Sequence, residues 1–110
     1  MFTSFLAQGR SVAVALALVT AAAIPASAET ITITIENLSF KPAEVKAKVG
    51  DTILWVNKDI LAHTATARDN SFDVTQPPKK TVSQTLTKTG TFDYYCRYHP
   101  NMTGQLVVEP

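Results

Sequence analysis

Residues 90–102 read GTFDYYCRYHPNM. A turn signal at Lys88-Thr89-Gly90 comes before a run of three aromatic residues that ends at Cys96, and this pattern predicts a β-strand over residues 91–96. The next six residues bring a histidine and a methionine, so that the spacing is C-x-x-H-x-x-M. Because cysteine, histidine and methionine lie so close together in the chain, a single turn brings three side chains able to bind soft metal ions to one place.

The rest of the chain reads as further short strands separated by turns. The alternation of Ile31, Ile33 and Ile35 with threonines is typical of a half-buried strand. Segments that resemble it cover residues 30–36, 44–49, 52–57, 62–68, 81–87 and 104–109. Residues 69–80, which contain Pro77-Pro78, are expected to form a loop. No amphipathic helix pattern appears, and the spacing predicts an all-β fold, an antiparallel β-sandwich or barrel of about seven strands.

The N-terminal residues have the layout of a secretory signal peptide. Arg10 is the only charged residue before an apolar run of 14 residues, Ser11 to Ile24, and Ala26-Ser27-Ala28 follows as a small-residue cleavage signal. A membrane-spanning helix needs about 20 apolar residues, so the run is short for an anchor. We expect cleavage after Ala28, which leaves residues 29–110 as one exported domain.

The composition of residues 29–110 excludes some classes of function. Nine basic residues balance nine acidic ones, so there is no argument for nucleic-acid binding, which needs a basic face. A single cysteine cannot form a disulfide within the chain. In an exported protein an odd cysteine indicates intermolecular pairing, a free thiol or a metal ligand.

The soft and borderline ligands of the chain can be placed in one set. Residues 29–110 contain two histidines, one cysteine and one methionine: His63, Cys96, His99 and Met102. Taken singly, each has a simpler explanation, since a lone cysteine or methionine usually fills a core and a histidine usually lies at the surface. Taken together, two imidazoles and a thiolate with a weak axial thioether form a blue-copper site.

At this point the sequence resembles the cupredoxins, the type 1 blue copper proteins, and among them the amicyanin and plastocyanin branch. The first half of the resemblance lies in Phe40 to Val45, in Val49 to Thr52 and in Trp55-Val56-Asn57 leading to His63. The second half lies in Gly90 to Cys96, followed by His99, Met102 and Gly104. The short segment between His99 and Met102 is similar to that of amicyanins.

The resemblance implies a Greek-key sandwich that holds one copper ion and carries single electrons between redox proteins, without enzymatic activity. The resemblance also implies two candidate redox partners, an amine dehydrogenase and a c-type cytochrome. We expect a periplasmic monomer that is not attached to a membrane after cleavage. The resemblance also implies that His99 reaches the surface through an apolar patch, for which Ile60, Leu61, Pro100 and Met102 are the candidates.

Other functions remain open at this point. Periplasmic copper storage or delivery would use the same four ligands, although the Met-rich and His-rich tracts of many copper-handling segments are absent from the sequence. A hydrolase using Cys96 with one histidine would need a third orienting residue and a substrate cleft, and the sequence indicates neither. Zinc could bind the cysteine and the two histidines, but it cannot change oxidation state.

Two residues near the ligands depart from the family pattern. Thr64 follows the first histidine where an asparagine is usual, and its hydroxyl can replace part of the hydrogen bonding between the two ligand loops. Tyr98 stands where a proline is usual, just before His99. Because tyrosine has a backbone N–H and proline has none, we expect the Tyr98 N–H to donate to the Cys96 sulfur.

Overall fold

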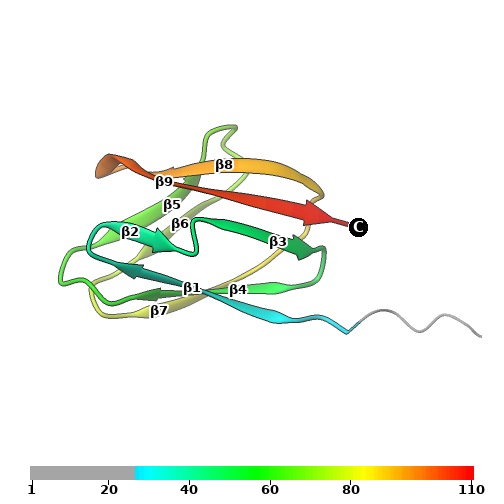
Figure 1. Cartoon of the computed structure of the whole chain (residues 1–110), viewed down its shortest axis with the longest axis horizontal. Coiled ribbons are helices and arrows are strands. Elements are labelled where there is room, and N and C mark those ends of the chain that lie inside the picture. Colours follow the sequence, from blue (N-terminus) through cyan, green and yellow to red (C-terminus); the bar gives the residue numbers. More distant parts are fainter. Residues whose placement is uncertain (1–26) are drawn as a thin grey trace, which may run out of the picture.

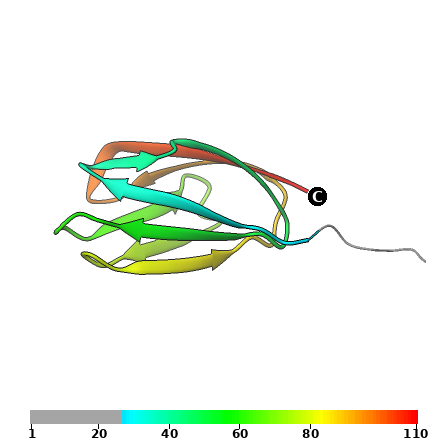
Figure 2. The ribbon, with the colours of Figure 1, turned by 60° about the horizontal axis from the view of Figure 1, so that its bottom comes forward.

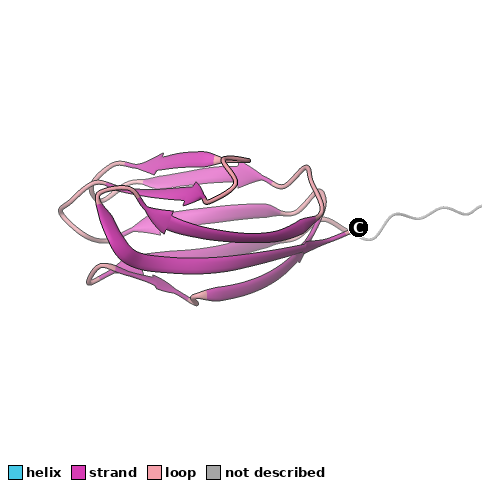
Figure 3. Ribbon diagram, turned by 90° about the horizontal axis from the view of Figure 1, so that it is seen from above, coloured by secondary structure: helices cyan, strands magenta, loops and turns pink. Residues whose placement is uncertain are grey.

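The structure is a computed structural model that describes residues 27–110, and these fold entirely into strands and loops (Figure 3). Residues 1–26, which make up most of the expected signal peptide, lie outside the described residues, so cleavage after Ala28 stays a prediction. Within residues 27–110 there is no helix with the length and apolar character needed to cross a membrane.

Residues 27–110 contain nine strands. In chain order they are β1 Thr30–Glu36, β2 Ser39–Lys41, β3 Glu44–Lys48, β4 Thr52–Asn57, β5 His63–Ala67, β6 Asp73–Gln76, β7 Thr81–Thr85, β8 Gly90–Cys96 and β9 His99–Glu109. The predicted all-β class is confirmed, with nine strands in place of about seven. The two additional strands are β2, which has three residues, and β6, which lies in the segment expected to be a loop.

The strands form two sheets that pack face to face (Figures 1 and 2). One sheet has the order β2-β1-β4-β7, and the other has the order β3-β9-β8-β5-β6. The expectation of purely antiparallel pairing is wrong at two places, because β1 pairs with β4 and β3 pairs with β9 in parallel. Parallel neighbours cannot be joined by a tight hairpin, so the chain crosses between the sheets to make them.

The core forms where the alternating apolar residues of the two sheets meet. Ile33 and Ile35 of β1 and Ile53 of β4 are fully buried and belong to the same core cluster as Leu106 of β9, which lies in the other sheet. Three aromatic rings fill the centre: the Tyr94 ring centroid lies 4.8 Å from that of Phe40 and 5.4 Å from that of Trp55, both in edge-to-face contact. Such edge-to-face pairs add about 0.5–1.5 kcal/mol to the burial of the rings.

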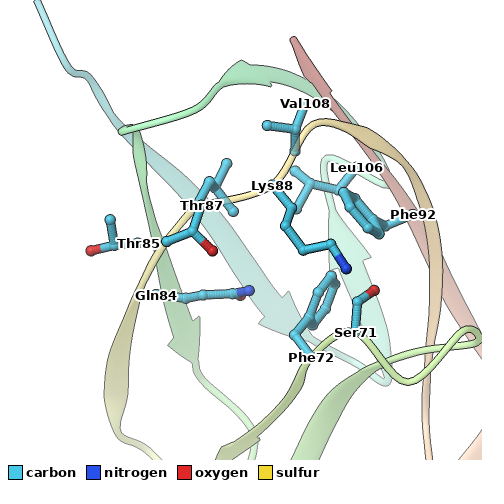
Figure 4. Close-up of a pocket in the computed structure, with 10 residues that line it drawn as sticks. Ser71, Phe72, Gln84, Thr85, Thr87, Lys88, Phe92, Leu106 and Val108 are labelled. Atoms are coloured by element: carbon cyan, nitrogen blue, oxygen red, sulfur yellow. The ribbon is translucent and has the colours of Figure 1, made fainter. Parts of the chain in front are cut away.

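Gln84 occupies a position in β7 where the strand pattern calls for an apolar residue. Its side chain points from β7 into a pocket between the sheets, toward Phe72 (Figure 4). Its Oε1 accepts a hydrogen bond of 3.0 Å from Nε1 of Trp55, whose side chain is fully buried. The polar residue is therefore needed to satisfy the one polar group of the buried indole.

Gln84→Leu is expected to destabilise the domain by about 1–3 kcal/mol, because the buried Trp55 N–H would lose its acceptor. Urea denaturation of the metal-free chain measures the change in the free energy of unfolding. Gln84→Glu is the matched control, since it keeps an acceptor oxygen and should recover most of the loss. Equal stability of the Leu variant and the wild type would show that the hydrogen bond contributes nothing.

Candidate metal centre

The four candidate ligands lie on three strands that end at one end of the sandwich. His63 begins β5, Cys96 ends β8, and His99 and Met102 lie at the start of β9. The β8–β9 turn and the loop between β4 and β5 both lie at the left of Figure 1, away from the C-terminus. His63 and Cys96 lie far apart in the sequence. They come to the same end of the sandwich because β5 pairs directly with β8.

A bulge in the β8–β9 pairing shapes this end. Tyr95 pairs with Thr103, but the next residue, Cys96, pairs with His99. Residues 100–102 are therefore extra on the β9 side, and a bulge of this kind re-aims side chains at the rim of a sheet. Met102 belongs to this bulged segment and not to a separate loop, and it is buried with Cys96 in the core.

The donor atoms lie at distances that suit a trigonal metal ion. The Cys96 Sγ is 3.8 Å from Nδ1 of His63 and 3.6 Å from Nδ1 of His99. The three ligand atoms all lie within 4.8 Å of one another. With metal–ligand distances of about 2.0–2.3 Å and angles of about 120°, a nitrogen and a sulfur ligand are about 3.8 Å apart. The residues therefore fit a metal ion bound in the plane of two imidazoles and one thiolate.

His99 is more exposed to solvent than the other three candidate ligands. His63 and Cys96 are fully buried and Met102 is 4% exposed. His99 is half-buried, and its ring centroid lies 5.2 Å from that of His63. A metal ion held here would be shielded from water, and His99 is the candidate ligand that lies nearest the surface.

Thr64 joins the two ligand-bearing segments, as its hydroxyl was expected to do. Its backbone N–H donates to the Cys96 Sγ at 3.3 Å, and its Oγ1 accepts from the Arg97 N–H at 2.9 Å. The Thr64 hydroxyl also lies 3.0 Å from that of Thr66, which donates to Oδ1 of Asp73 at 2.7 Å. The β8–β9 turn is thus tied to β5 and, through Asp73, to β6.

The expectation for Tyr98 is wrong. Among the hydrogen bonds of the described residues, the backbone donor to the Cys96 sulfur is Thr64, and Tyr98 makes no such bond. The side chain of Tyr98 faces solvent and is 53% exposed. The Arg97 guanidinium lies 5.5 Å from the centroid of its ring. The Thr64 N–H takes the role because β5 lies beside β8.

Asp59 contacts a candidate ligand, and the sequence analysis did not single it out. Its Oδ2 lies 2.8 Å from Nε2 of His63, the ring nitrogen opposite the candidate metal. Burial raises the pKa of the Asp59 carboxyl, but hydrogen bonds from the backbone of Leu38 and Asn37 and from His63 outweigh this and hold the pKa below its ordinary value. An Asp four residues before a His is a weak signal on its own, because the contact depends on a loop.

Asn57 holds that loop in place. The Asn57 side chain is 2% exposed. Its Nδ2 donates to the carbonyl oxygens of Leu61, Gln76 and Pro77 at 2.9, 3.1 and 3.1 Å. Its Oδ1 accepts from the Asp59 N–H at 2.9 Å. One buried amide thus fixes the segment between β4 and β5 that carries Asp59 and leads to His63.

Apolar side chains lie exposed around the same end. Ile60, Leu61 and Tyr98 are 78%, 49% and 53% exposed, and Pro100 is also exposed. Three of the four residues expected to frame a patch near His99 are therefore at the surface. Met102 is the exception, because the bulge turns it into the core.

Comparisons with known proteins place the chain in a family. The model of the family described as cupredoxin-like domain matches residues 10–108. Amicyanin of Paracoccus denitrificans is 33% identical over 85 residues, which cover 72% of this chain and 65% of that protein. Amicyanin-alpha of Methylorubrum extorquens is 31% identical over 114 residues, with 98% of this chain and 96% of that protein covered. The methylamine utilization protein MauL of the same organism is 35% identical over 80 residues, which cover 69% of this chain and 70% of that protein.

Solved structures give the same result. The crystal structure of amicyanin from Paracoccus versutus superposes with a TM-score of 0.63 at 28% identity, covering 78% of this chain and 85% of that chain. A structure of an oxidized amicyanin mutant superposes with a TM-score of 0.65 at 29% identity, covering 72% of this chain and 81% of that chain. Fold, sequence and ligand set agree, and the chain belongs to the cupredoxin-like family.

Proposed function

We propose that this protein is a blue copper electron carrier that holds one copper ion through His63, Cys96, His99 and Met102. The observation that carries the proposal is the spacing of the thiol sulfur from the two Nδ1 atoms, 3.8 and 3.6 Å, which fits a trigonal metal ion. Met102 would supply a fourth ligand, a thioether, from the bulge of β9. The amicyanins among the relatives support the same assignment.

The residues of the chain suit a change of oxidation state with little movement. When bound, copper supplies a one-electron couple between Cu(I) and Cu(II). The thiolate and thioether favour the reduced ion and the imidazoles accept both states. The Thr64 hydrogen bonds fix the β8–β9 turn and Asn57 fixes the β4–β5 loop, so the four side chains would need little movement when the bound ion changes oxidation state.

The route of the electron to a partner would pass through His99. Of the four proposed ligands, it is the one that is not buried. Ile60, Leu61 and Tyr98 lie exposed at the same end and would exclude water from the contact with a redox protein. A contact of this kind shortens the distance between the copper ion and the partner's redox group.

The relatives suggest the kind of partner and the compartment. Two of them are named amicyanin and one is named a methylamine utilization protein, so a dehydrogenase that oxidises an amine is the proposed electron donor. A c-type cytochrome is the proposed acceptor. The protein would act in the periplasm as a monomer, after removal of residues 1–28, and the mass of the mature chain purified from cells tests the cleavage after Ala28.

The visible spectrum of the mature protein with one equivalent of Cu(II) tests the proposal. We expect an intense blue absorption from charge transfer between the Cys96 thiolate and copper. Cys96→Ser is the control, because a serine hydroxyl occupies the same position without the sulfur and should abolish the colour. A colourless wild type that still binds copper would contradict the electron-carrier proposal and would favour copper storage or delivery.

A further inference from the structure

The ring of His63 lies between the Cys96 sulfur and the Asp59 carboxylate. Its Nδ1 faces the Cys96 Sγ at 3.8 Å, and its Nε2 lies 2.8 Å from Oδ2 of Asp59. The His63 side chain is fully buried and that of Asp59 is 16% exposed. Because Asp59 is an acceptor at Nε2, this nitrogen carries the proton and Nδ1 presents its lone pair to the metal position.

The Asp59 carboxylate is fixed independently of His63. Its Oδ1 accepts from the Asn37 N–H at 2.8 Å, and its Oδ2 accepts from the Leu38 N–H at 3.0 Å. Asn37 and Leu38 form the turn between β1 and β2, and both have left-handed backbones with φ of 54° and 59°. The two successive N–H groups of this turn therefore point into the β4–β5 loop. They hold the Asp59 carboxylate beside Nε2 of His63.

We propose that Asp59 is a positioning residue that fixes the ring of His63 for metal binding and sets the balance between Cu(II) and Cu(I). A carboxylate that accepts a hydrogen bond from a ligand imidazole raises its basicity and orients it. The negative charge stabilises the more positive copper ion, so Asp59 favours Cu(II). This inference rests on the proposed function, since it assumes that copper binds at His63.

The Thr64 N–H acts in the opposite sense. It donates to the Cys96 Sγ at 3.3 Å, and withdrawing charge from the thiolate favours Cu(I). The two contacts reach the site from opposite sides, one through the imidazole and one through the sulfur. The two contacts therefore shift the reduction potential in opposite directions, and removal of Asp59 leaves the Thr64 contact unopposed.

Asp51 provides a matched control at another part of the domain. It is 4% exposed, and its carboxylate accepts from the Glu29 N–H at 2.8 Å and from the Lys48 N–H at 2.9 Å. Asp51 thus has the same kind of support as Asp59, a pair of backbone N–H groups, but it contacts no ligand. Asp51→Asn removes the same charge as Asp59→Asn and leaves His63 untouched.

The test compares Asp59→Asn and Asp51→Asn with the wild type in three measurements. Asp59→Asn should raise the midpoint potential by about 59 mV, which corresponds to a tenfold lower ratio of Cu(II) to Cu(I) affinity for a one-electron couple. It should also weaken the binding of Zn²⁺, a probe that does not change oxidation state, by about 10–100-fold. Asp51→Asn should change the potential by less than about 18 mV, the equivalent of a twofold affinity ratio, and the Zn²⁺ affinity by less than twofold. The third measurement, ¹⁵N NMR of the metal-free wild type, should show His63 with its proton on Nε2.

The outcomes separate the two proposals. A wild type without blue colour contradicts the proposed function, whereas the zinc and NMR measurements still judge the role of Asp59. A blue wild type with equal potentials and zinc affinities for the two variants would overturn the role of Asp59. If Asp59→Asn does not fold, the tautomer of the wild type decides, because a proton on Nδ1 of His63 contradicts the inference without any variant.

Discussion

Removal of copper is expected to lower the melting temperature of the mature domain by about 15–30 °C. A ligand present at about a thousand times its Kd stabilises the folded state by about 4 kcal/mol. In a domain of this size each kcal/mol shifts the melting temperature by about 4–8 °C. The effect is large because 82 residues bury only a thin core and no disulfide is available to support it.

This stabilisation would act at the end of the sandwich that carries the candidate ligands. Copper would join His63 at the start of β5 to Cys96 and His99 on either side of the β8–β9 turn, so it would hold together segments 33 residues apart. Thermal unfolding followed by circular dichroism, with and without one equivalent of copper, measures the shift. Cys96→Ser should melt at the same temperature in both conditions. A wild type with equal melting temperatures would contradict a preformed site.

Strand positions were predictable where burial alternates along the chain. The bounds of β1 and β4 agree with the prediction, because isoleucines or a tryptophan face the core at every second residue and a turn follows. The strand β6, Asp73–Gln76, was missed because its residues are mostly polar and Pro77-Pro78 follows them. It is a strand because of its pairing with β5, and alternation shows which face is buried but not which strand lies beside it.

The grouping of the candidate ligands could be predicted because three of them lie within seven residues, which leaves the fold little freedom to separate them. The contacts around the ligands were harder. Thr64 was predicted correctly because its hydroxyl is next to His63 in the chain. Tyr98 was predicted wrongly because the direction of a backbone N–H in a turn depends on the local bulge. Asp59 was missed because the turn that fixes its carboxylate comes from residues 21 and 22 positions earlier.

Gly104→Ala is expected to destabilise the domain by about 3 kcal/mol, since it forces extra volume into a packed core. A Cβ at position 104 would lie far inside van der Waals contact with Cζ and Oη of Tyr94. Tyr94 cannot move easily, because it is fully buried and its ring is in edge-to-face contact with Phe40 and Trp55. Urea denaturation of the metal-free chain measures the loss.

A double-mutant cycle with Tyr94→Leu separates steric contact from other effects of the alanine. Leucine lacks the outer part of the ring, so Gly104→Ala should cost about 1–3 kcal/mol less in that background. Equal costs in both backgrounds would show that Tyr94 is not the obstacle. Tyr94 and Gly104 are paired residues of β8 and β9, two pairs before the one in which Cys96 lies opposite His99. If the clash displaces this pair, the register that presents both ligands changes with it, and the copper absorption of Gly104→Ala should shift along with its stability.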